Sequence, residues 1–165
     1  MSTFLKEASD YFEDLATKHV DLKHSDSNVA FCRFQDNKQF EQLTINASKN
    51  LLIVAHYSGR AAGGFEDANV KNVITIRVSC YSKTVSSGDI KDAIEKALAI
   101  LLDLWVRMRK DFDDEENDCP WMQWIDWENI SYNELDGPWL QNHYAWDLII
   151  PYKTYLPDYD ENKWQ

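Results

Sequence analysis

Two segments of the chain repeat apolar residues at the spacing of an amphipathic helix. In residues 3–19 the apolar side chains return every three or four positions, and charged side chains fill most of the other positions. Residues 86–110 carry a broader apolar stripe of the same period. Ser86 or Ser87 can cap this second segment, and Asp89 lies in its first turn, where the helix dipole favours a negative charge. The pattern therefore predicts two helices, each with one face that needs an apolar partner.

Other segments have the patterns of β-strands. Residues 51–57 form a continuous apolar run of strand length, which is typical of a central strand covered on both faces. Residues 70–82 and 143–153 alternate apolar and polar positions, as half-buried strands do. Three of the five glycines fall in residues 58–72, which we expect to form a long loop at the tip of a hairpin. Shorter strands are predicted at residues 28–34 and 121–134.

The predicted order of elements is α-β-β-β-α-β-β. Such an order predicts an α+β fold, with two helices packed on a mostly antiparallel or mixed sheet. A chain of 165 residues, 44% of them hydrophobic, suits one domain with a single core. We expect residues 1–156 to form that domain and residues 157–165 to form a polar C-terminal tail.

Charge is distributed unevenly along the chain, whose formal net charge is -11. Residues 29–110 are mildly basic, whereas residues 111–165 hold fourteen acidic and two basic residues. An acidic surface binds DNA and anionic membranes poorly, because phosphate binding depends on lysine and arginine displacing counterions. The chain has neither the apolar start of a signal peptide nor an apolar run long enough to span a bilayer. We therefore expect no membrane association and synthesis in a reducing cytosol.

The residues that most often carry chemistry show no recognisable motif. Cys32, Cys80 and Cys119 are an odd number without CxxC spacing, and the first two sit in apolar runs that predict buried thiols. The four histidines lack HxH, HxxxH and HExxH spacing. The acidic stretch 111–119 lacks the spacing of a calcium loop, and residues 59–64 lack that of a phosphate-binding loop. We expect no catalytic, cofactor-binding or metal site, and these absences favour binding or assembly over catalysis.

Aromatic residues concentrate near the C-terminus. Residues 121–165 hold six of the seven tryptophans, and tryptophan and tyrosine are typical anchors of protein interfaces. About half of these tryptophans should pack in the core, notably Trp146 in an alternating strand, whereas Trp139 on a turn and Trp164 on the tail are the best interface candidates. The full set of candidate interface residues is Arg60, Phe65, Glu66, Asp67, Asp113, Asp114, Glu115, Glu116, Trp139, Tyr159 and Trp164.

The order of four segments resembles a known family. These are LLIVAHY, VITIRVSCY, the capped helix SSGDIKDAIEKALAILLDLW and HYAWDLIIPYKTY. Together with the N-terminal helix, over residues 3–155, they resemble the tail-terminator (tail-completion) and head–tail neck ring proteins of bacteriophages. The acidic stretch 111–119 and the tryptophan-rich stretch 121–134 depart from that pattern.

The resemblance implies a structural role in the virion. Such a subunit would form a homo-oligomeric ring in the tail or neck after assembly in the host cytoplasm. It would contact other neck, portal-adaptor or tail proteins, and DNA would pass nearby without specific binding. Ring subunits meet head to tail, so the mildly basic middle and the acidic end could supply the two complementary faces. The loop expected at residues 58–72 would project and become ordered on assembly.

Two other classes of function remain open at the level of the sequence. One is a small acidic immunity or anti-defence inhibitor that mimics nucleic acid with surface carboxylates. The other is an unrecognised enzyme, which would need His56, His143 and carboxylates to converge in one pocket.

Overall fold

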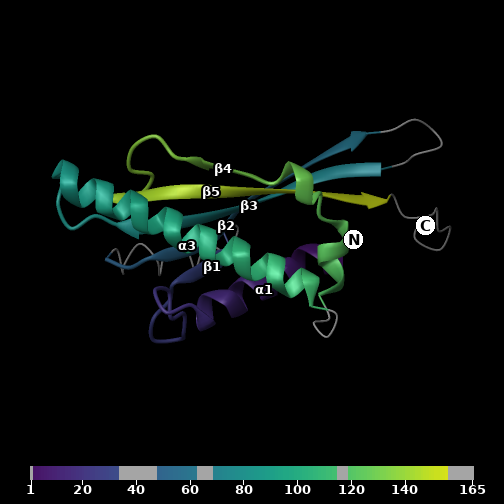
Figure 1. Ribbon diagram of the computed structural model, residues 1–165, viewed down its shortest axis with the longest axis horizontal. Coiled ribbons are helices and arrows are strands. Elements are labelled where there is room, and N and C mark those ends of the chain that lie inside the picture. The colour runs from purple at the N-terminus through teal and green to yellow at the C-terminus, as the bar shows by residue number, and fades with distance from the viewer. Residues whose placement is uncertain (1, 34–47, 63–68, 115–118, 156–165) are drawn as a thin grey trace, which may run out of the picture.

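A five-stranded mixed sheet carries two helices on one face (Figure 1). The computed structural model describes residues 2–33, 48–62, 69–114 and 119–155. The elements are α1 (Ser2–Lys18), β1 (Phe31–Arg33), β2 (Leu51–Ala62), β3 (Asn69–Tyr81), α3 (Ser87–Asp113), the short 3₁₀ helices η1 (Pro120–Trp124) and η2 (Trp127–Asn129), β4 (Ser131–Glu134) and β5 (His143–Tyr155). The predicted fold class and element order are confirmed. The predicted tail, residues 157–165, lies outside the described residues.

The strands follow the order β1-β2-β3-β5-β4 across the sheet. The short strand β1 pairs in parallel with β2, and every other neighbouring pair is antiparallel. The prediction of a long loop over residues 58–72 was wrong, because β2 continues through Ala62 and β3 begins at Asn69. Gly59 pairs with Asn72 within this extension. Glycine content indicated a loop, but the backbone pairing of a long hairpin keeps residues 58–62 and 69–72 in strands.

The main core lies between the helices and the sheet. Ile74, Ile76 and Val78 of β3 are buried on the helical side, as their alternation predicted. Phe12 of α1 and Leu101 of α3 are fully buried against them in the same cluster. Each large apolar side chain removed from water in this way stabilises the fold by about 1.5–3 kcal/mol. Both amphipathic stripes therefore have the sheet as their partner.

A smaller apolar cluster lies on the other face of the sheet. Its buried members are Cys32, Leu51 and Ile53, and Trp139 and Leu140 pack against them. The expectation that β2 is covered on both faces is thus confirmed for its first residues. Burial of Cys32 and Cys80 is confirmed as well.

The tryptophan-rich segment is not the strand predicted at residues 121–134. It forms η1 and η2, and only Ser131–Glu134 pair as a strand. Pro120 begins η1, and Trp121 is 3% exposed, with its ring 5.5 Å from that of Tyr11 in α1. The tryptophan packs in the helical layer, and this contact between distant segments overrides a local preference for an extended chain.

Helix α3 is longer at its C-terminus than its sequence pattern indicated. Its start is as predicted, since the Ser86 side chain accepts a hydrogen bond from the backbone of Asp89 at 3.3 Å. Its end is at Asp113, so Asp111 and Asp113 are helical and do not belong to an acidic loop. In the part of the chain that the structure describes, no helix combines the length and the apolar character needed to cross a bilayer.

Candidate assembly surfaces

The face of the sheet that points away from the helices is set by the alternation along β3 and β5. Ile74, Ile76 and Val78 point into the helical layer, so the residues between them point to the opposite side. Residues directly opposite each other in an antiparallel pair share a face. The pairs on this open side are, in order along the strands, Lys71–Lys153, Val73–Pro151, Thr75–Ile149, Arg77–Asp147 and Ser79–Ala145.

One end of this side is closed by a polar network within the chain. Arg77 donates from Nε and a terminal nitrogen to the two carboxylate oxygens of Asp147, at 2.8 and 2.9 Å. The guanidinium of Arg77 lies 5.0 Å from the centre of the Trp139 ring, and Trp139 Nε1 donates to Ser79 Oγ at 2.6 Å. Such charge-assisted and stacked contacts fix Trp139 against its own sheet. Trp139 was expected to stand on a turn as an interface anchor, but its indole is half-buried in contacts within the chain.

The other end of the same side carries positively charged residues. Lys71 and Lys153 face each other across β3 and β5, and Arg60 of β2 occupies the register position opposite Lys71. Lys71 and Lys153 are exposed. Between this row and the Arg77–Asp147 pair, four residues form a half-buried strip. We call the open sheet surface the patch made by Lys71, Val73, Thr75, Ile149, Pro151 and Lys153.

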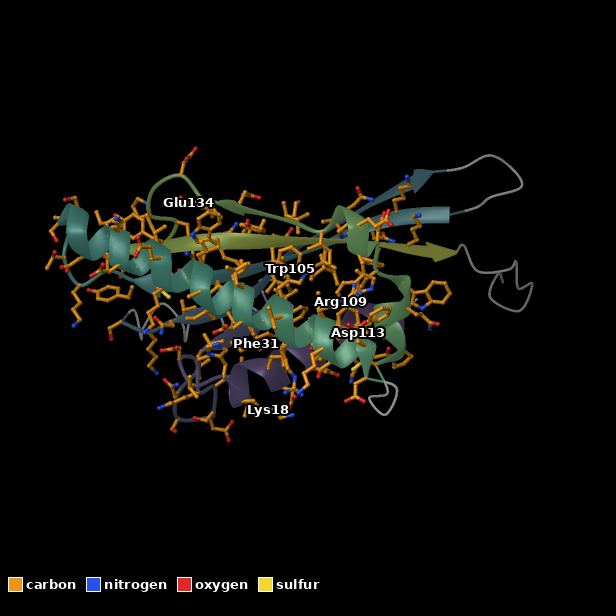
Figure 2. The ribbon with its side chains drawn as sticks, viewed as in Figure 1. Lys18, Phe31, Trp105, Arg109, Asp113 and Glu134 are labelled. Carbon is orange, nitrogen blue, oxygen red and sulfur yellow. The ribbon has the colours of Figure 1, made fainter. Side chains whose placement is uncertain are left out.

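A second surface lies at the C-terminal end of α3, in the helical layer. The Phe112 ring lies 4.7 Å from that of Trp127 in η2, which places η2 against the last turn of α3. Arg109 pairs with Asp113 at 3.2 Å and lies 5.3 Å from the Trp127 ring, and Figure 2 shows Arg109 and Asp113 at this end of the helix. Phe112 and Trp124 are each 39% exposed. We call the acidic aromatic end the surface made by Phe112, Asp113, Asp114, Trp124 and Glu128.

The candidate interface residues fall into separate places. Asp113 and Asp114 lie on the acidic aromatic end, Arg60 lies in the positive row of the sheet, and Trp139 lies beside the Arg77–Asp147 pair. The remaining candidates, Phe65, Glu66, Asp67, Glu115, Glu116, Tyr159 and Trp164, lie outside the described residues.

Sequence reasoning missed nine of the eleven residues of these two surfaces, among them Lys71, Lys153, Phe112 and Trp124. The two lysines are 82 positions apart and become neighbours only through the register of β3 and β5, for which the sequence holds no local signal. Phe112 was visible as an aromatic residue within the acidic stretch 111–119, but its position on a helix became clear only from the extent of α3.

A groove of about 610 Å³ lies beside the N-terminal part of α3. Lys49, Lys83 and Lys96 line it together with Asp21, and Lys96 pairs with Asp21 at 3.2 Å. Cys80 also lines the groove, and burial raises the pKa of its thiol to about 12. Because the thiolate is the reactive form, this cysteine remains a protonated, unreactive thiol at neutral pH. The groove presents charge, but no activated sulfur nucleophile.

His56 and His143, the two histidines named for the enzyme alternative, are not among the residues that line this groove. His143 is fully buried, and its ring nitrogens lie 3.0 Å from the carbonyl oxygen of Lys49 and 3.3 Å from that of Gln141. These contacts hold His143 in place at the start of β5. His56 pairs through its backbone with Thr75, elsewhere on β2. Among the described residues, no three histidine, cysteine or acidic side chains are grouped so that they could hold a metal ion.

Comparison of the chain with protein-family models finds no match, and comparisons with curated proteins and with solved structures find none either. The functional argument therefore depends on the chemistry of the surfaces themselves.

Proposed function

We propose that the chain is a structural subunit of a bacteriophage virion that forms a homo-oligomeric ring at the tail terminator or head–tail neck. It joins the portal or head to the tail, and it lines a channel through which DNA passes. The observation that carries this proposal is the outer edge of β2, along which the described residues place no strand beyond β1. Strand β1 pairs only with Leu52–Val54, so within the described residues the outer edge of β2 has no strand partner from Ala55 to Ala62.

An open strand edge of this length has a physical cost. Its unpaired backbone groups are a template for pairing with another chain, and monomeric proteins usually shorten, bend or cover such edges. Here the far ends of β2, β3 and β5 extend beyond the helical layer (Figure 1). A subunit that assembles with copies of itself covers such an edge in the assembly. The resemblance of the element order to that of tail-terminator and neck proteins, which form rings, also supports self-assembly.

The charge of the chain supports the proposed relation to DNA. A net charge of -11, with most of the excess in residues 111–165, disfavours tight binding of phosphate. DNA moving through an acid-lined ring would therefore slide without being held. Tight binding of duplex DNA by the free subunit at physiological salt would contradict this part of the proposal.

Self-association of the full chain tests the proposed function directly. We expect light scattering after size exclusion to give a discrete multiple of the 19.3 kDa subunit mass, and electron micrographs of that fraction to show rings. A chain that remains a monomer at every protein and salt concentration would overturn the proposal. If such a monomer also inhibited a nuclease in competition with DNA, the acidic inhibitor class would replace it.

A further inference from the structure

We infer that the open sheet surface of one subunit docks on the acidic aromatic end of α3 in a second copy of the chain. The inference rests on the proposed self-assembly and names the two surfaces that meet. The partner is another copy of the same chain. It makes the contact through the carboxylates and aromatic rings around Phe112, Asp113 and Glu128.

Arginine and lysine residues on β2, β3 and β5 lie in one row across the sheet, which we call the positive row. Like charges directly opposite each other in a sheet repel, and a soluble domain gains nothing from placing them in register. Yet Arg60, Lys71 and Lys153 stand in one register row across three adjacent strands. Neighbouring strands lie about 4.8 Å apart, so the row concentrates three cationic residues within about 10 Å. An anionic surface placed on this row removes the repulsion.

Strands β3 and β5 also contain a cross-strand pair whose positive charge is neutralised within the subunit. Arg77 stands opposite Asp147, and the two form a bidentate pair. Lys71 stands opposite Lys153 in the same ladder, and neither lysine has an ion-pair partner among the residues that the structure describes. A carboxylate supplied by a second copy would neutralise this row, as Asp147 neutralises Arg77.

The chemistry of the acidic aromatic end matches the open sheet surface. The sheet surface has a half-buried strip, with Val73 and Ile149 among its members, bordered by lysines. The acidic aromatic end has Phe112 and Trp124 partly exposed, and the exposed carboxylates of Asp113 and Asp114 follow Phe112 in the chain. Apolar area meets apolar area and carboxylates meet lysines when the two surfaces are brought together. Complementary charge of this kind sets orientation and partner choice more than total affinity.

The two surfaces cannot meet within one subunit. Helix α3 packs on the side of the sheet formed by Ile76 and Val78, whereas Lys71 and Lys153 point to the other side. Each subunit therefore has one surface on either side of its sheet. A contact between unlike surfaces repeats from copy to copy, and it closes into a ring when the rotation per subunit permits.

Charge reversal on both surfaces gives a sharp test. In the full chain, Lys71→Glu/Lys153→Glu makes the sheet surface acidic, and Asp113→Lys/Glu128→Lys makes the end of α3 basic. Each double variant alone should repel its own copies, and its self-dissociation constant should rise at least about tenfold in sedimentation experiments. An equimolar mixture of the two variants restores opposite charge at every contact, so the mixture should assemble as the wild type does.

The control reverses two exposed lysines elsewhere. Lys23→Glu/Lys83→Glu changes the net charge by the same amount near the N-terminal end of α3, and it should leave assembly unchanged. Thermal melting followed by circular dichroism shows whether each variant folds, and Lys71→Gln/Lys153→Gln replaces the reversal if that variant does not. If the wild type assembles and both reversals assemble equally well, the docking is wrong while the proposed function stands. A monomeric wild type overturns both.

Discussion

The Tyr11 hydroxyl donates a hydrogen bond of 2.8 Å to Asp111 Oδ2, joining α1 to α3 across 100 positions of sequence. Arg107 Nε lies 2.9 Å from the same oxygen. Asp111 is only 4% exposed, so these two donors take the place of water around its carboxylate. Burial and the neighbouring carboxylate raise the pKa of Tyr11 far above its usual value, which keeps the hydroxyl protonated as a donor.

Replacing Tyr11 by phenylalanine tests the contribution of this hydrogen bond. The substitution keeps the ring and its packing against Trp121, but it leaves the buried Asp111 carboxylate with one donor fewer. We expect the free energy of unfolding, measured in urea, to fall by about 1.5–3 kcal/mol, as for other hydrogen bonds to charged groups. Tyr132→Phe is the matched control, because Tyr132 is 45% exposed, and it should change stability by less than about 0.5 kcal/mol. Equal effects of the two substitutions would contradict the assignment.

The pKa of Asp111 predicts how stability depends on pH. Burial raises that pKa, but the hydrogen bonds from Arg107 and Tyr11 outweigh burial and hold it below its usual value of 3.8. The folded state therefore binds this proton less tightly than the unfolded state does. The resulting stabilisation is complete above the unfolded pKa and is lost as the pH falls through the folded pKa.

The Asp111→Asn variant isolates this effect. Between neutral pH and a pH well below 3.8, the wild type should lose more free energy of unfolding than the variant does. The loss of unfolding free energy in Tyr11→Phe should lie between those of the wild type and Asp111→Asn, because this substitution removes one of the hydrogen bonds that lower the pKa of Asp111. Denaturant unfolding across this pH range provides the measurement, and parallel curves for the wild type and Asp111→Asn would show that the carboxylate does not contribute.

The Arg77–Asp147 pair predicts a stability effect on the opposite side of the sheet. The side chains are 21% and 11% exposed, so the pair is only partly screened by solvent. Asp147→Asn leaves the guanidinium without its counter-charge, and we expect a loss of about 2 kcal/mol in the free energy of unfolding. Asp92→Asn on the exposed face of α3 is the control and should be close to neutral. A loss no larger than that of the control would mean that solvent compensates Arg77 fully.

Much of the fold could be predicted because its signals are local. The apolar period of α1 and α3 and the alternation of Ile74, Ile76 and Val78 each show which side of an element faces the core. The Ser86 cap is likewise a matter of a few adjacent residues. The candidate surfaces could be predicted only in part, since Asp113 and Arg60 were named while their neighbours in space were not.

What the sequence determined alone is the order of the helices and main strands and the buried faces of α1, α3 and β3, because helical and extended backbones each impose a fixed period on the side chains. Only the tertiary structure decided which residues stand opposite each other. The register of β3 and β5 places Lys71 beside Lys153 and Arg77 beside Asp147, and packing against Tyr11 turned an acidic residue, Asp111, into a buried one. These placements depend on hydrogen bonds and contacts between segments far apart in the chain, so no local pattern of residues could reveal them.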